Sequence, residues 1–340
     1  MTIATGTGLR EEEITDAGLN YIKIPISRGG KNPFSELRLL FALFKIYRKL
    51  KPELVHLVTI KPVIYGGILS RLMSVKGVVI AISGMGYLFT RQRQGLVKKL
   101  VSWIYRFSLG HKNSRVIVQN RTDRKLLQDM GVLNEGQDVL IPGSGVNLRE
   151  FVPKPLPEGI PLVILPARML WDKGVKEFVE AAKILQADGV KARFALVGPA
   201  DLDNPAAVTI EQLEVWKNEG PVEWWGYCAD MPSVYAEASL VVLPSYREGM
   251  PKSLLDALAS GRAIVTTDAP GCRDVVESEK NGKLVPVGDS VSLANSIISI
   301  LSDRNILVDM GKYARKIAEE RYRVEYVVKE HMEIYKNLLN

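Results

Sequence analysis

Short runs of consecutive apolar residues alternate with longer amphipathic segments along the chain. Runs of four to six such residues, rich in β-branched side chains, are typical of strands. The strands predicted in this way span residues 54–57, 77–82, 115–119, 162–165, 193–197, 240–243 and 263–266. Between them, apolar residues recur every three to four positions, a pattern that predicts helices over residues 33–50, 175–187, 252–260 and 291–301.

The predicted strands are continuous apolar runs, as is typical of parallel strands that are buried on both faces. Strands and helices in alternation therefore predict an α/β fold with covered parallel sheets. A proline-rich segment over residues 149–159 contains Pro153, Pro155, Pro157 and Gly159, and it marks a boundary between two domains. Two Rossmann-like domains that face each other would place a ligand in the cleft between them, at the carboxyl ends of the strands.

Composition excludes several classes of protein. With 340 residues, 46% hydrophobic and 24% charged, the chain is neither disordered nor limited to one ordinary domain. Two cysteines, Cys228 and Cys272, are too few for a disulfide scaffold or a thiolate cluster, and three widely separated histidines show no zinc-ligand spacing. No apolar stretch reaches the roughly 18 residues of a transmembrane helix, and the N-terminus lacks the apolar core of a signal peptide. These features predict a cytosolic location.

Charge is divided unequally between the two halves. Residues 1–150 carry a net charge of +12 and residues 151–340 one of −5, within an overall charge of +7. A basic half favours an anionic partner, which is nucleic acid, a membrane surface or a phosphorylated ligand. Nucleic acid is disfavoured because the sequence has no zinc finger, no RNP aromatic pattern and no Gly-x-x-Gly clamp.

The loop that follows the strand at 162–165 carries two cations. Arg168 and Lys173 stand near its two ends, between the strand and the next helix. A guanidinium fork and an ammonium in such a loop suit a diphosphate. The alternative interpretation is a solvated loop with two ordinary surface cations.

The loop after the strand at 240–243 carries a second candidate site. Glu248 lies in the turn, Pro251 suits the first position of the next helix, Asp256 falls one turn into that helix, and Gly261 suits its C-terminal cap. Free backbone N–H groups at a helix start suit a phosphate, while a carboxylate suits sugar hydroxyls. The alternative is that Glu248 and Asp256 are capping and surface charges.

These motifs resemble those of the retaining glycosyltransferases of family 4, which have the GT-B fold. The spacing Glu248-x7-Asp256 resembles the E-x7-E motif of that family, and Arg168 and Lys173 match the cations that its members set on the donor diphosphate. Residues 265–274 resemble the next loop of the family. Three segments of the first half are similar to the subgroup that extends polyprenyl-diphosphate-linked sugars in O-antigen, capsule and exopolysaccharide synthesis: residues 54–56, 59–62 and 83–90.

The resemblance implies an acceptor-side domain over residues 1–150, a nucleotide-sugar-binding domain over 151–322, and a C-terminal helix, 323–340, that returns to the first domain. It implies catalytic roles for Arg168, Lys173 and Glu248. The residues that it implies in donor binding are Tyr227, Gly249, Met250, Pro251, Lys252, Ser253 and Asp256. Those that it implies on the acceptor side are Lys61, Gly84, Met85 and Gly86.

The implied reaction moves a sugar, a hexose or an N-acetylhexosamine, from a UDP-sugar to a polyprenyl-diphosphate-linked saccharide, with retention at the anomeric carbon. No cofactor or metal is implied, since two fixed cations face the diphosphate. Two alternatives stay open. One is a UDP-sugar 2-epimerase of GT-B architecture, and the other is a truncated relative that binds nucleotide without catalysis.

Two features depart from the family pattern. The second acid of the motif is Asp256 instead of glutamate, so its side chain is one methylene shorter. Family members also begin with a strand, a Gly-rich turn and a helix ahead of the segment that resembles residues 2–5. The resemblance therefore implies that this first unit is missing.

Two basic amphipathic segments, residues 33–50 and 95–112, lie in the first half. Such segments can lie in an anionic lipid interface, although apolar stripes more often pack on a sheet. Because the implied acceptor is lipid-linked, we expect the basic half to contact an anionic membrane and the protein to be peripheral on the cytoplasmic face of the inner membrane. His56, at a strand end, either points into the cleft or fills the core.

Overall fold

The structure, a computed structural model, describes residues 1–6, 11–26, 33–84 and 96–340. Its strands are β1 (Thr2–Thr5), β2 (Asn20–Lys23), β3 (Leu54–Val58), β4 (Gly77–Ile82), β5 (Ser114–Val118), β6 (Asp138–Leu140), β7 (Leu162–Pro166), β8 (Arg193–Val197), β9 (Val222–Gly226), β10 (Leu240–Leu243), β11 (Ala263–Thr267) and β12 (Gly282–Val285). Its helices are α1 (Glu11–Asp16), α2 (Pro33–Leu50), α3 (Ile60–Leu72), α4 (Leu96–Leu109), α5 (Arg121–Asp129), the 3₁₀ turn η1 (Trp171–Lys173), α6 (Val175–Ala187), α7 (Ile210–Glu219), α8 (Met231–Glu237), α9 (Lys252–Ala259), α10 (Ser290–Leu301), α11 (Arg304–Arg321) and α12 (Val324–Leu339).

The first half of the chain builds a four-stranded parallel sheet in the order β3-β4-β5-β6, and β1 and β2 form a separate parallel pair. Strands β3 and β4 pair with Val55 opposite Val78, and β4 and β5 with Ile80 opposite Val116. Val78, Ile80 and Val116 are fully buried on the face that α2, α3 and α4 cover, and α12 packs on the other face. The predicted α/β class is therefore confirmed.

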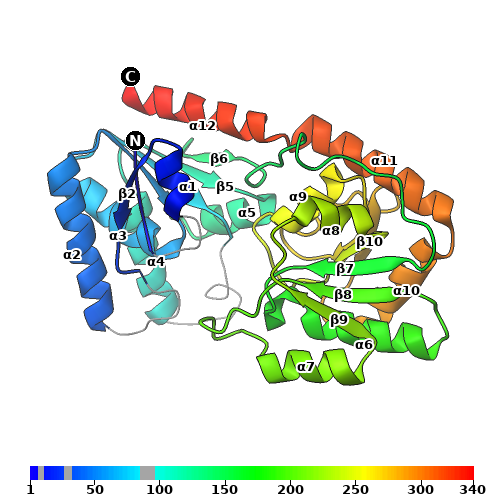
Figure 1. Ribbon diagram of the computed structural model, residues 1–340. Coiled ribbons are helices and arrows are strands. Elements are labelled where there is room, and N and C mark those ends of the chain that lie inside the picture. The colour runs from blue at the N-terminus through cyan, green and yellow to red at the C-terminus, as the bar shows by residue number, and fades with distance from the viewer. Residues whose placement is uncertain (7–10, 27–32, 85–95) are drawn as a thin grey trace.

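The second half builds a six-stranded parallel sheet in the order β12-β11-β10-β7-β8-β9. Figure 1 shows β10, β7, β8 and β9 of this sheet side by side. Two buried apolar clusters cover its two faces; one includes Phe178 of α6 and the other Leu254 of α9. Because β7 and β10 are neighbours and parallel, the loops that follow them leave the sheet at the same edge. This topology brings the two candidate loops of the sequence together.

The chain crosses between the two sheets at two places that lie side by side. The Val146 amide donates to the Tyr322 carbonyl oxygen at 2.7 Å, and the Val324 amide donates to the Val146 carbonyl oxygen at 3.1 Å. Beyond this crossing, α12 runs back over the first sheet (Figure 1). There Ile334 and Leu338 pack with buried Val79 of β4. The C-terminal helix thus lies against the first half of the molecule.

Some local expectations differ from the structure. Pro251 is the N-cap of α9 and not its first helical residue, because its ψ of 114° is extended and its carbonyl oxygen accepts from the Leu254 amide at 3.0 Å. By contrast, the prediction for Gly261 is confirmed, because this glycine follows the cap residue Ser260 and ends α9 with a left-handed φ of +65°. His56 neither fills the core nor points into a cleft, since its ring packs against α12.

Candidate active site

Two loops meet at the edge of the second sheet where β7 and β10 end. The β7 loop passes through η1 to Gly174, whose φ of +73° is left-handed. A β-carbon at this position would collide with the Pro244 carbonyl oxygen of the β10 loop. Glycine is therefore required here, because the two loops approach at backbone distance.

Lys173 and Glu248 form an ion pair between these loops. Their side chains are only 19% and 12% exposed. The Ser245 hydroxyl lies 2.7 Å from Glu248 Oε1 and 2.9 Å from the Asp172 carbonyl oxygen, so it ties the carboxylate to the β7 loop. The site thus holds one cation and one carboxylate in a largely buried position, where charges are screened less than at an open surface.

Arg168 lies apart from this pair. Its guanidinium forms an ion pair with Asp201, in the loop that follows β8, and its side chain is 45% exposed. The structure therefore brings Lys173 and Glu248 into contact, while Arg168 is turned toward a different partner at the same edge of the sheet.

The start of α9 holds the predicted donor-binding residues. Met250 and Pro251 are buried in the turn, and Tyr235 Oη donates to the Ser253 carbonyl oxygen at 2.8 Å. Lys252 forms an ion pair with Asp256 one turn along the helix. Burial raises the pKa of the Asp256 carboxyl to about 6, against the lowering effect of the Lys252 ammonium. Asp256 is therefore a buried acid whose pKa lies above its usual range.

The acceptor-side residues are only partly brought to this edge. A β-carbon on Gly84 would lie 3.2 Å from the Gly249 nitrogen, so the end of β4 touches the turn of the second domain. Lys61 instead forms an ion pair with Glu36 of α2 at 2.6 Å. Met85 and Gly86 lie outside the described residues. Tyr227, predicted on the donor side, follows β9 and is 60% exposed.

Three residues at this edge were missed by the sequence analysis. Asn120 Nδ2 donates to the Gly249 carbonyl oxygen at 2.8 Å, and Asp123 forms an ion pair with Arg247. Asn120 directly follows the predicted strand 115–119, so its capping role could have been inferred from position. Its contact with the second domain leaves no local sequence signal.

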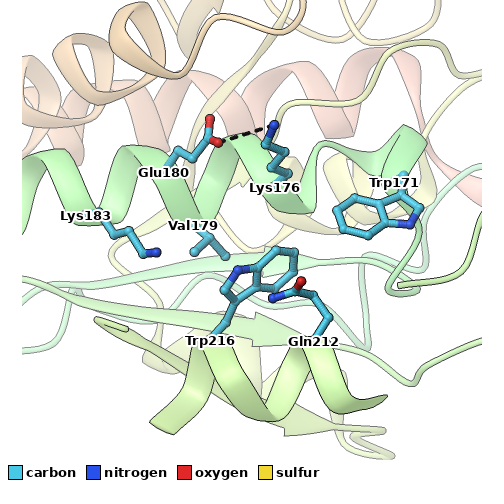
Figure 2. Close-up of a pocket in the computed structure, with 7 residues that line it drawn as sticks. All are labelled: Trp171, Lys176, Val179, Glu180, Lys183, Gln212 and Trp216. Carbon is cyan, nitrogen blue, oxygen red and sulfur yellow. Dashed lines mark ion pairs between the residues drawn. The ribbon is translucent and has the colours of Figure 1, made fainter. Parts of the chain in front are cut away.

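A pocket of about 390 Å³ opens between α6 and α7 (Figure 2). Trp171 and Trp216 line it, and their rings meet edge to face with centroids 5.8 Å apart. The other lining residues are Lys176, Val179, Glu180, Lys183 and Gln212. None of the predicted site residues lines this pocket, although Trp171 shares η1 with Lys173.

The described part of the chain offers neither a ready metal site nor a membrane-spanning helix. There, no group of three or more His, Cys, Asp or Glu residues is arranged to hold a metal ion. Among the same residues, no helix has the length and apolar character needed to cross a membrane.

Two family models match this chain on either side of the predicted boundary at residues 149–159. The model described as Glycosyl transferases group 1 matches residues 160–303, and the one described as Glycosyl transferase 4-like matches residues 1–120. The chain belongs to the glycosyltransferases. The first match contains both candidate loops, from Arg168 to Asp256, so the family assignment and the site geometry concern the same residues.

Relatives of this glycosyltransferase cover most of its length. An N,N'-diacetylbacillosaminyl-diphospho-undecaprenol alpha-1,3-N-acetylgalactosaminyltransferase of Campylobacter jejuni is 28% identical and aligns with 96% of this chain and 88% of its own. A UDP-Gal:alpha-D-GlcNAc-diphosphoundecaprenol alpha-1,3-galactosyltransferase of Escherichia coli is 25% identical, over 82% of this chain and 74% of its own.

Solved structures share the fold of this glycosyltransferase. A glycosyltransferase of Rickettsia africae superimposes with a TM-score of 0.78 at 19% identity, covering 100% of this chain and 90% of that one. The HepE protein of Anabaena, in complex with UDP and glucose, superimposes with a TM-score of 0.79 at 17% identity, over 98% and 91%. These neighbours are GT-B glycosyltransferases, which confirms the predicted GT-B fold.

Proposed function

We propose that this glycosyltransferase moves a sugar from a UDP-sugar to a polyprenyl-diphosphate-linked saccharide, with retention at the anomeric carbon. The observation that carries the proposal is the Lys173–Glu248 pair, held where the β7 and β10 loops meet the start of α9. The printed activities of the relatives from C. jejuni and E. coli support a lipid-linked acceptor, and the complexes of HepE support a uridine nucleotide donor.

The chemical difficulty is the departure of the nucleoside diphosphate. The bond between the anomeric carbon and the β-phosphate oxygen breaks, and negative charge grows on that oxygen. The Lys173 ammonium, the Arg168 guanidinium after release from Asp201, and the N–H groups at the start of α9 would stabilise this charge. The acceptor hydroxyl adds on the same face of the sugar and gives its proton to the departing phosphate.

The two acids would hold different parts of the donor. Glu248 loses part of its contact with Lys173 when a diphosphate competes for the ammonium, and its carboxylate then accepts from donor-sugar hydroxyls. Asp256 would accept from the ribose hydroxyls. Because the charge on the leaving group is met by side-chain cations and helix N–H groups, we propose that the reaction proceeds without a metal.

The test is to measure UDP release from a panel of UDP-sugars with and without a short polyprenyl-diphosphate-linked saccharide. The proposal predicts release with at least one donor, and that release must depend on the acceptor. Turnover of a UDP-sugar in the absence of acceptor would favour the 2-epimerase. UDP binding in calorimetry without any turnover would favour a non-catalytic nucleotide-binding protein.

We also propose that α2 contacts an anionic membrane at the cytoplasmic face of the inner membrane. Leu39, Leu43 and Tyr47 pack inward, whereas Phe34 and Phe41 on the outer side are 80% and 58% exposed. Basic side chains flank these exposed rings: Arg38, Lys45, Arg48 and Lys49. Each such cation near an anionic surface contributes about 1 kcal/mol.

This contact predicts flotation with anionic vesicles at low salt. The double variant Phe34→Ser/Phe41→Ser should lose most of the bound fraction, because it removes exposed apolar area and leaves the net charge unchanged. The variant Tyr326→Ser, which removes an exposed ring of α12, is the matched control and should bind as the wild type does. Equal flotation of the double variant and the wild type would contradict the assignment of α2.

A further inference from the structure

The start of α5 reaches from the first domain to the turn that carries Glu248. Asn120 Nδ2 donates to the Gly249 carbonyl oxygen at 2.8 Å and lies 3.4 Å from the Glu248 carbonyl oxygen. One turn along, Asp123 forms an ion pair with Arg247. Asn120 is 1% exposed and Asp123 is fully buried. Two adjacent polar side chains of one domain are thus buried against consecutive residues of the other.

The amide of Asn120 does more than cap a helix. Its Oδ1 accepts from the Asp123 amide at 2.7 Å, which is the N-cap bond of α5. A serine or aspartate would make that bond equally well. The Nδ2 donors of asparagine are used elsewhere, on the Gly249 carbonyl oxygen and on Asp123 Oδ2 at 3.1 Å. The choice of asparagine is therefore accounted for by its contact with the second domain.

The same turn is also held by the end of β4. A β-carbon on Gly249 would collide with the Ser83 carbonyl oxygen, and one on Gly84 would lie 3.2 Å from the Gly249 nitrogen. Within the second domain, the Glu248 amide donates to the Pro270 carbonyl oxygen at 2.9 Å. The backbone of Glu248 and Gly249 is therefore fixed from both domains, and the carbonyl oxygens of these two residues keep Asn120 as their donor only when the domains are together.

We propose that Asn120, Asp123 and Arg247 form a clasp that positions the Glu248 turn for transfer when the two domains close. The proposal rests on the proposed function and adds three positioning residues to it. The clasp acts through the turn, because its contacts fix the backbone on which the Glu248 carboxylate is carried. When the domains separate, the Asn120 donors and the ion pair become hydrated and the turn loses its support from the first domain.

The variant Asn120→Ser tests the clasp against a purely structural role. Serine keeps an acceptor for the Asp123 amide but cannot reach the Gly249 carbonyl oxygen. We expect kcat for transfer to fall at least tenfold, while UDP affinity by calorimetry stays within threefold, since the proposed nucleotide contacts all lie in the second domain. Asn120→Ala should show the same loss of kcat together with a lower Tm. If Asn120→Ser has the kcat of the wild type, Asn120 serves only as the N-cap of α5, and the proposal is overturned.

A second measurement does not depend on the reaction. Small-angle X-ray scattering of the wild type, Asn120→Ser and Asp123→Asn should give a larger radius of gyration for both variants, because each loses a contact between the domains. Identical scattering and kcat in all three proteins would overturn the clasp. If the wild type transfers no sugar to any acceptor while the variants still expand, the proposed function fails and the clasp between the domains stands.

Discussion

Replacing Lys173 with methionine removes the ammonium and keeps most of the bulk of the stem. Glu248 is then left 12% exposed with the Ser245 hydroxyl as its remaining partner in the β10 loop. Removing one partner of a fully buried ion pair costs about 3–5 kcal/mol. Because both side chains here keep some contact with solvent, we expect a smaller loss of folding free energy, about 1–3 kcal/mol.

The effect of Lys173→Met on transfer should be separable from this loss of stability. A group that stabilises developing charge typically contributes a factor of about 10²–10³ in rate, or about 3–4 kcal/mol. We expect the rate of UDP release at saturating donor and acceptor to fall by that factor at temperatures where the variant is fully folded. Arg168 and the α9 N–H groups would support the residual rate.

The double variant Lys173→Met/Glu248→Gln completes the comparison. A neutral amide at position 248 is not an unpaired charge in the absence of the ammonium. The Tm of the double variant should therefore lie closer to the wild-type Tm than the Tm of Lys173→Met does. Transfer should not recover, because the cation is still missing. A loss below about threefold in Lys173→Met, or recovery of transfer in the double variant, would refute the charge-stabilising role of Lys173.

Three further predictions follow from the same structure. The pKa of Asp256 is raised to about 6, so uridine affinity by calorimetry should rise about tenfold from pH 5 to pH 7 as the carboxyl ionises. The variant Asp256→Asn should abolish this pH dependence. If the affinity of Asp256→Asn changes with pH as that of the wild type does, Asp256 does not bind the ribose. Partial burial and the neighbouring His331 lower the pKa of His56 to about 4, below its usual 6.5, so its contribution to stability is present above pH 6.5 and is lost as the pH falls toward 4. The Tm of the wild type should therefore fall more between pH 7 and pH 4.5 than that of His56→Gln, which stays neutral and can still contact Tyr335, and parallel curves would contradict this reasoning. Transfer should persist in excess EDTA, whereas its loss on chelation and return with a divalent cation would contradict a metal-independent reaction.

The sequence predicts well the strands that form a continuous apolar run, the four-residue β10 included, and predicts poorly the strands that polar residues interrupt. Strands such as β4 and β8 were located to the residue because a continuous apolar run ends where the chain leaves the sheet. Strands β2, β6 and β12 are short, and polar residues stand among their apolar ones, so they form no continuous apolar run and were missed. Pattern reasoning therefore succeeds where burial extends over a whole element.

The candidate site was predictable in its residue types and less so in its contacts. The motifs placed Lys173 and Glu248 at the ends of two strands, but only the sheet order, with β7 beside β10, brings them into contact. The partner of Arg168, Asp201, comes from a third loop that carries no recognisable motif. The contact of Asn120 with Gly249 joins residues 129 positions apart, and such a distant pair has no signature in one sequence.

The most direct test of the central claim is the structure of the product. The protein should be incubated with its UDP-sugar and a short polyprenyl-diphosphate-linked saccharide, and the isolated lipid analysed by mass spectrometry and proton NMR. We predict one added sugar per acceptor, with the anomeric configuration that the sugar had in the donor. An inverted anomeric centre, or UDP release with no sugar added to the lipid, would contradict the account.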